Sequence, residues 1–152
     1  LTNPANAHAQ VLGVFDPALC GKMAQVLDSL GTRHALVVHS EGMDEIGLGK
    51  TKISELKNRR IENYGIDGKE FGFEKKDIPR VHGKEEGAKI ILGVLEGRKG
   101  AARDISILNA AAAIYVGGKA NSIKDGIGLA ENSVDSGRAK EKLEQLIKFS
   151  GE

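Results

Sequence analysis

In the first third of the chain, strand-like apolar runs lie on either side of a segment whose apolar residues recur at helical spacing. Residues 9–15 form a short apolar run, which is typical of a buried strand. Asp16 is a residue type favoured at helix N-caps, and Pro17 suits the first helical position. Apolar residues then recur at helical spacing up to Gly31, and a second apolar run covers residues 34–39. Strand, helix and strand with short joins predict a βαβ unit with parallel strands.

The middle of the chain changes to a hairpin pattern. A loop at residues 40–49 is followed by two strand-like segments, 51–57 and 60–66, on either side of Asn58 and Arg59. Such a pair predicts a β-hairpin with a polar turn. Residues 68–84 are polar and hold Pro79, so we expect a loop with one short turn.

Helical spacing dominates the remainder. Apolar positions predict helices over 88–95 and 105–116, each ended by glycine, and over 123–134, where Ser122 resembles a capping residue. An alanine run at 110–113 would permit close packing of a helix. Ser136 is expected to cap the last helix, which should turn three residues inward: Leu143, Leu146 and Ile147. With the first helix, the chain has about five helices.

The predicted fold class is α/β, with a partial parallel sheet and a β-hairpin. Two parallel strands and a hairpin make a small sheet for about five helices. The chain also opens on Leu1 instead of methionine and has no signal-peptide pattern. We therefore expect a piece of a larger domain, with further strands supplied upstream of Leu1.

Composition narrows the functional classes. The chain has 152 residues, of which 40% are hydrophobic and 28% charged, as expected of a globular protein and not of a disordered or membrane protein. The net charge is +1, which offers no support for nucleic-acid binding. Aromatic residues make up 4% and tryptophan is absent, so the core should be aliphatic. A single cysteine fits a reducing compartment.

The loop at residues 40–49 is the first candidate site. Ligands of open α/β sheets bind beyond the carboxyl ends of the parallel strands, and this loop follows the second strand. It carries Asp44 and Glu45 side by side. Adjacent carboxylates can hold a hard cation such as magnesium, especially one shared with a phosphate ligand. A solvated acidic loop is the alternative on spacing alone.

Three other features are weaker candidates. Gly49-Lys50-Thr51 suggests a P-loop, but Asp44 stands where the motif needs glycine, and a strand follows in place of a helix. His39 lies beside the acidic loop, although a structural histidine is the commoner case. Cys20 is expected to be a packing residue.

A basic group near the start of one helix leaves two interpretations open. The group comprises Arg98, Lys99 and Arg103, around the glycine that precedes the helix at 105–116. Its side chains could meet a phosphate at the helix start, or they could form a solvated corner.

Four stretches, taken together, match one family in order. They are Leu-Thr-Asn-Pro-Ala at 1–5, Val-Val-His-Ser-Glu-Gly-Met-Asp-Glu at 37–45, Thr-Lys-Ile-Ser-Glu-Leu at 51–56, and segment 100–113 with Ala-Arg-Asp and Leu-Asn-Ala-Ala. Residues 1–146 thereby resemble the anthranilate phosphoribosyltransferases. Ser40 and Met43 stand where this family has glycine and leucine, and Lys50 replaces the proline of a Gly-Pro-Thr-Lys segment.

The resemblance implies a specific place and role for the chain. Residues 1–152 would be the C-terminal part of a nucleoside phosphorylase/phosphoribosyltransferase-type α/β domain, without the helical domain and the first part of the α/β domain. The family joins anthranilate to phosphoribosyl pyrophosphate with magnesium (Mg2+) and releases pyrophosphate. The metal role falls on Asp44 and Glu45, no catalytic residue is assigned, and the main substrate-binding residues would lie upstream of Leu1.

Further expectations come from the same resemblance. The chain alone should be inactive, and the intact enzyme should be a cytoplasmic homodimer that binds neither membrane nor nucleic acid. Arg103 and Asn109 match family positions and are assigned to packing and helix hydrogen bonds. Two alternatives stay open: a non-catalytic nucleic-acid-binding relative of the same fold, and a pyrimidine nucleoside phosphorylase.

Overall fold

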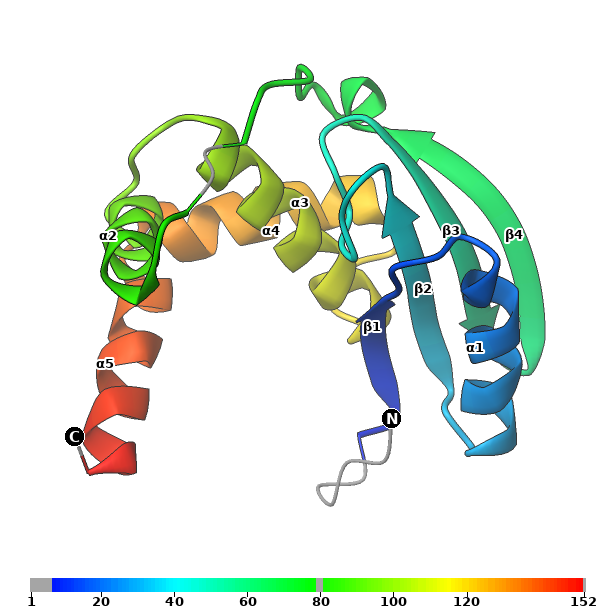
Figure 1. Ribbon diagram of the computed structural model, residues 1–152. Helices are drawn as coiled ribbons and strands as arrows, with labels where there is room; N and C mark the ends of the chain where they lie inside the picture. Colours follow the sequence, from blue (N-terminus) through cyan, green and yellow to red (C-terminus); the bar gives the residue numbers. More distant parts are fainter. Residues whose placement is uncertain (1–6, 79–80, 152) are drawn as a thin grey trace.

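The computed structural model, which describes residues 7–78 and 81–151, has a four-stranded mixed sheet (Figure 1). Neighbouring strands follow sequence order: β1 pairs in parallel with β2, β2 antiparallel with β3, and β3 antiparallel with β4. Their bounds are Ala9–Gly13, His34–Ser40, Lys50–Lys57 and Arg60–Asp67. The parallel pair and the hairpin are both confirmed. The predictions on residues 1–5 and on Pro79 lie outside the described residues.

Five α-helices accompany this sheet in the described part of the chain, which confirms the α/β class. They are α1 (Leu19–Ser29), α2 (Lys84–Leu95), α3 (Ala101–Val116), α4 (Ile123–Asp135) and α5 (Arg138–Ser150), with a short 3₁₀ turn at Gly68–Phe71. Over residues 7–78 and 81–151, none of these helices combines the length and the apolar character that a membrane crossing requires.

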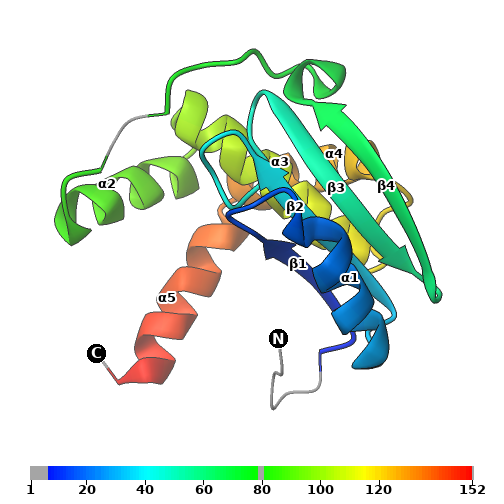
Figure 2. The same cartoon turned by 45° about the vertical axis from the view of Figure 1, so that its right-hand side comes forward.

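Strand alternation divides the core between the two faces of the sheet. On one face, Ala35 and Val37 of β2 pack with Leu56 and with Cys20 of α1, which confirms the packing role of this cysteine. On the other face, the alternate residues of the same strands pack against α3 and α4 (Figure 2). The sheet is therefore a middle layer, and its aliphatic core agrees with the scarcity of aromatic residues.

The alanine run of α3 does permit close helix packing. A Cβ atom added to Gly126 of α4 would lie 2.5 Å from the carbonyl oxygen of Ala111. The backbones of α3 and α4 thus approach each other without an intervening side chain, as a small residue at this position allows.

Two helix-end predictions were wrong. Helix α1 begins at Leu19, with Ala18 as its N-cap, because Asp16 opens a separate turn ahead of it: Asp16 O accepts a hydrogen bond from Leu19 N at 3.0 Å, and Asp16 Oδ1 accepts one from Ala18 N at 2.8 Å. Ser136 is the C-cap of α4, and Gly137, with a φ of 81°, is the residue before α5. The left-handed glycine turns the chain, so the hydroxyl of Ser136 is not at the start of α5.

The inward face predicted for the last helix was also wrong at Leu146 and Ile147, whereas Leu143 is half-buried. Leu146 and Ile147 are 64% and 46% exposed, and α5 has no buried residue among those described. The physical reason is visible in Figures 1 and 2, where α5 runs away from the sheet after its first turn. Helical periodicity identified an apolar face but could not say what covers it.

Candidate functional site

The acidic pair lies in the loop between β2 and β3, at the carboxyl end of the parallel strands, as predicted. Both Asp44 and Glu45 are exposed. The residues around them are not: Ser40, Ile46, Gly47 and Leu48 are buried. The loop therefore presents two carboxylates to solvent from a backbone that is anchored in the protein.

A tight turn opens the loop. The backbones of Ser40 and Met43 exchange two hydrogen bonds, each 3.1 Å long. Gly42 between them has a φ of 77°, a left-handed conformation that side chains disfavour and glycine adopts freely. The turn places Asp44 directly after a closed ring of backbone hydrogen bonds.

Two hydroxyl groups hold the far side of the loop. Ser40 Oγ donates to the carbonyl oxygen of Glu45 at 2.7 Å and lies 2.7 Å from Thr51 Oγ1. A serine hydroxyl has a single hydrogen, so the Thr51 hydroxyl donates between these two. The backbone N–H of Gly47 donates to Ser40 Oγ at 2.7 Å. Neighbouring strands thus fix the carbonyl of Glu45 and the amide of Gly47.

Asn109 of α3 holds the residue between them. Ile46 N donates to Asn109 Oδ1 at 3.0 Å, and Asn109 Nδ2 donates to Ile46 O at 2.8 Å. The same Nδ2 donates to Ile105 O at 2.9 Å within the helix. The side chain of Ile46 is fully buried in the core beneath. The helix hydrogen bond expected of Asn109 is present, but its main contact reaches across to the acidic loop.

The end of strand β1 packs directly against the backbone of the acidic loop. A Cβ atom added to Gly13 would lie 1.4 Å from the carbonyl oxygen of Asp44. Only a glycine at this strand end lets the backbone of Asp44 approach so closely. Residues from β1, β2, β3 and α3 therefore meet on the four consecutive residues 44–47.

The charges of the pair suit a divalent cation. Partial desolvation of its carboxyl group, with the charge of Asp44 as a second cause, raises the pKa of Glu45. Like charges held together in this way are stabilised by a cation. The donors are hard carboxylate oxygens, which magnesium prefers. Within residues 7–78 and 81–151 no three acidic, histidine or cysteine residues cluster as a metal site, so water and ligand oxygens would complete the coordination.

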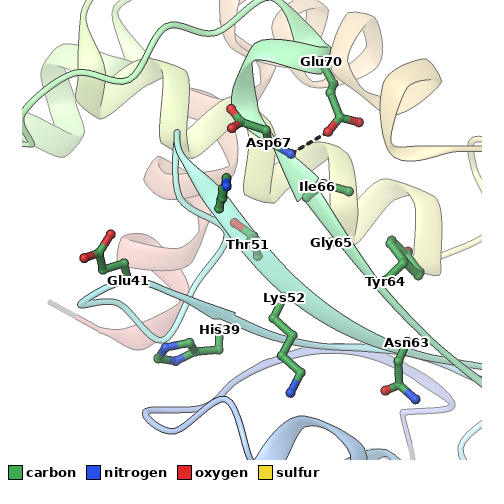
Figure 3. Close-up of a pocket in the computed structure, with 11 residues that line it drawn as sticks. His39, Glu41, Thr51, Lys52, Asn63, Tyr64, Gly65, Ile66, Asp67 and Glu70 are labelled. Carbon is green, nitrogen blue, oxygen red and sulfur yellow. Dashed lines mark hydrogen bonds between the residues drawn. The ribbon is translucent and has the colours of Figure 1, made fainter.

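His39 lies on the other side of the strand ends. Its Nδ1 is 2.8 Å from Val14 O; a carbonyl oxygen only accepts, so Nδ1 carries the proton. The ring also lines an open cavity of about 760 Å³ with Lys52 and Asn63, all three drawn in Figure 3. Neither Asp44 nor Glu45 lines this cavity. His39 thus joins the ends of β1 and β2 and is separate from the acidic pair.

The remaining sequence candidates fall into structural roles. Lys50 and Thr51 begin strand β3, so the rejection of the P-loop is confirmed. Arg103 is only 3% exposed and forms a 2.9 Å ion pair with Asp135 of α4, which confirms its assignment to packing and excludes a solvated corner. Arg98 and Lys99 are exposed, as a solvated corner requires.

A second polar cluster occupies the opposite end of β2. The carboxylate of Glu55 accepts hydrogen bonds from Tyr115 and Tyr64, both at 2.7 Å, and lies 2.8 Å from His34 Nε2. Burial alone would raise its pKa, but these hydrogen bonds outweigh burial and lower the pKa of Glu55. The cluster ties β2, β3, β4 and α3 together and lies apart from the acidic loop.

Sequence reasoning missed the residues that hold the loop. Ser40 and Thr51 pair across β2 and β3, which no local pattern indicates. Asn109 did carry a usable signal, because it is an amide one turn from Ile105 on an apolar helix face. A polar residue at a core position usually has a specific partner. Gly13 carried no signal, since a glycine at a strand end has many explanations.

Comparison with known proteins gives a consistent set of relatives. Residues 1–140 match the glycosyl transferase family, a/b domain. The chain is 52% identical to the anthranilate phosphoribosyltransferase of Methanocorpusculum labreanum, over 99% of this chain and 45% of that protein. It is 50% identical to the enzyme of the same name from Methanococcoides burtonii, over 99% of this chain and 43% of that protein. The chain thus spans less than half the length of these relatives.

Solved structures agree with these relatives. The crystal structure of anthranilate phosphoribosyltransferase from Thermus thermophilus superposes with a TM-score of 0.84 at 36% identity, covering 93% of this chain and 43% of that one. The Saccharomyces cerevisiae enzyme in complex with 4-fluoroanthranilate gives a TM-score of 0.82 over 92% of this chain and 42% of that one. At 24% identity, this second likeness supports the fold alone.

Proposed function

Because the chain belongs to the glycosyl transferase family, a/b domain, we propose that it is the C-terminal part of the α/β domain of an anthranilate phosphoribosyltransferase. The observation that carries this proposal is the acidic loop. A pair of carboxylates, held by four elements at the carboxyl end of the parallel strands, occurs in a chain 52% identical to a relative of that name. The reaction would transfer a phosphoribosyl group from phosphoribosyl pyrophosphate to anthranilate, a step of tryptophan synthesis.

Asp44 and Glu45 are the residues of this chain that would hold magnesium. When bound, the metal supplies positive charge that offsets the charge of the pyrophosphate leaving group. The two carboxylates would bind and orient magnesium, and neither needs to act as a general base. The anthranilate nitrogen attacks the ribose carbon, the bond from that carbon to pyrophosphate breaks, and the nitrogen loses a proton to solvent.

The chain by itself is proposed to be inactive. It spans 45% or less of the two curated relatives described above, so more than half of such an enzyme lies outside the matched segment. The intact enzyme is proposed to be a cytoplasmic homodimer, and both of these properties rest on the family resemblance. The two alternatives, a nucleic-acid-binding relative and a pyrimidine nucleoside phosphorylase, are not favoured, because the relatives carry another name.

A chimera tests the proposal. In the Methanocorpusculum labreanum enzyme, the segment that matches this chain is replaced by the chain itself. We expect the chimera to consume anthranilate, followed by its fluorescence, in the presence of phosphoribosyl pyrophosphate and magnesium. We expect the 152-residue chain alone to show no turnover. A folded chimera without activity would contradict the shared function, and turnover by the chain alone would contradict its inactivity.

The metal role has its own variants in this chimera. Asp44→Asn with Glu45→Gln should lower turnover at least about a hundredfold, because the charge on the leaving group is no longer offset. Glu131→Gln, which removes an exposed carboxylate on α4, is the matched control and should leave turnover unchanged. Equal activity of the double variant and the control would remove Asp44 and Glu45 from the metal site.

A further inference from the structure

The acidic loop is ordered by contacts to its backbone and not by contacts to its carboxylates. Between Asp44 and Gly47, the described hydrogen bonds involve the carbonyl of Glu45, both polar groups of Ile46 and the amide of Gly47. Both carboxylates stay exposed. The loop is therefore already shaped before any ligand arrives, and little ordering is left to oppose binding.

Among the residues that hold the acidic loop, Asn109 is the farthest from it in sequence. It lies 63 residues from Ile46 in sequence, and its amide pairs with both the N–H and the C=O of that residue. The pairing resembles that of a neighbouring strand, although it comes from a helix. Since Nδ2 also donates to Ile105 O, every hydrogen of the side-chain amide is engaged and its orientation is set.

Ile46 directly follows the acidic pair, so the orientation of the Glu45–Ile46 peptide determines the backbone conformation of Glu45. The Ile46 side chain is fully buried against the face of α3 that also carries Leu108 and Ala112. A buried side chain fixes the depth of Ile46. The two hydrogen bonds between Asn109 and Ile46 also fix the rotation of the peptide planes on either side of Ile46, which packing alone does not determine.

We propose that Asn109 is the positioning residue of the acidic pair: its amide holds the Ile46 peptide and thereby sets how Asp44 and Glu45 face a divalent cation. This inference rests on the proposed function, since it takes the pair to be the metal site. Residues that orient metal ligands from behind are commonly worth about 10- to 100-fold in metal affinity. Asn109 acts through Ile46 and does not itself bind the metal.

The experiment uses the 152-residue chain with Mn2+ as the probe. Mn2+ broadens nearby signals in a ¹H–¹⁵N spectrum, so titration reports the affinity at the Glu45 amide. We expect Asn109→Ala to weaken Mn2+ binding about tenfold and to speed hydrogen exchange of the Ile46 amide. Asn109→Asp, almost the same size, keeps an acceptor for Ile46 N but places an oxygen against Ile46 O, so it should weaken binding too.

The control is Ser106→Ala, which removes an exposed hydroxyl of α3 bonded to its own helix at Ala102 O. It should change neither Mn2+ affinity nor Ile46 exchange. Unchanged Mn2+ affinity in the Asn109 variants overturns the positioning role, even if their melting temperature falls. If Asn109→Ala does not fold, Asn109→Asp gives the same test.

Failure of the metal assignment is separable from failure of the positioning role. Asp44→Asn with Glu45→Gln is titrated in parallel. If wild-type broadening persists in this double variant, the acidic pair is not the metal site, and the proposed function and the inference fall together. If the double variant abolishes broadening while Asn109→Ala leaves it intact, only the inference falls.

Discussion

Replacing Gly13 with alanine tests the packing of the acidic loop from the side of the sheet. The added Cβ would lie 1.4 Å from the carbonyl oxygen and 2.4 Å from the carbonyl carbon of Asp44. Ordinary contact with Cβ begins near 3.4 Å, so the two backbones must separate by roughly 3.4 − 1.4 = 2.0 Å. Both atoms at the clash belong to backbone or to Cβ, so no side-chain rotation can relieve it.

Neither partner can move freely by that distance. Gly13 lies in register with Val38, and Val14 N donates to Val38 O at 3.0 Å. Asp44 is followed by the anchored residues Glu45 and Ile46. Overpacking of this kind costs about 1–3 kcal/mol, and a clash with backbone belongs at the upper end. We therefore expect a loss of about 3 kcal/mol and a melting temperature lower by about 6–12 °C.

The assay combines thermal unfolding with Mn2+ titration. If the loop gives way, Mn2+ affinity falls together with stability, because the carboxylates move with the Asp44 backbone. Gly65→Ala is the matched control in a strand: its Cβ would lie 3.6 Å from Thr51 O, an ordinary contact, and should cost little. A Gly13→Ala protein as stable as the Gly65→Ala protein would refute the close approach of β1 to the loop.

Two further predictions concern stability away from the site. In α4, Gly126→Ala should lose about 2 kcal/mol in urea unfolding because its Cβ would meet the α3 backbone at 2.5 Å, whereas Gly128→Ala, with open space around it, should gain up to about 1 kcal/mol; equal midpoints would contradict the contact. The pKa of Glu55 is lowered in the fold, so its contribution is full above its ordinary value of 4.5 and is lost as the pH falls through the lowered pKa. Urea midpoints measured from about pH 7 to about pH 3 should therefore fall less steeply for Glu55→Gln than for wild type, and parallel curves would contradict this.

Most of the fold could be predicted because local patterns specify it. The continuous apolar run of β2 predicts a strand buried on both faces, and the helical spacing of α1 predicts a helix with one buried face. The hairpin turn was predictable as well: Asn58 and Arg59 both have positive φ, 50° and 66°, as two-residue hairpins require. Asparagine tolerates this conformation, and strand lengths on either side leave only these two residues for the turn.

The errors occurred where tertiary contacts determine the outcome. Periodicity gave α5 an apolar face, but nothing in the described structure buries Leu146 or Ile147. The basic neighbours of Arg103 left a solvated corner open as an alternative to packing, and the residue that excludes it, Asp135, is 32 residues away on another helix. In both cases the deciding group lies outside any window that a local pattern samples.

The acidic pair itself could be predicted from its place after β2, whereas its geometry could not. The four groups that hold residues 44–47 come from β1, β2, β3 and α3, and each reaches the loop from a different direction. The orientation of the carboxylates therefore depends on the docking of α3 against the sheet. Helices α2 and α5 supply none of the hydrogen bonds that anchor residues 44–47 in the described structure, so changes confined to their outer faces can lower stability without turning Asp44 and Glu45. Changes that separate α3 from β2 must both lower stability and turn the two carboxylates, because Asn109 of α3 holds Ile46 in the loop that follows β2.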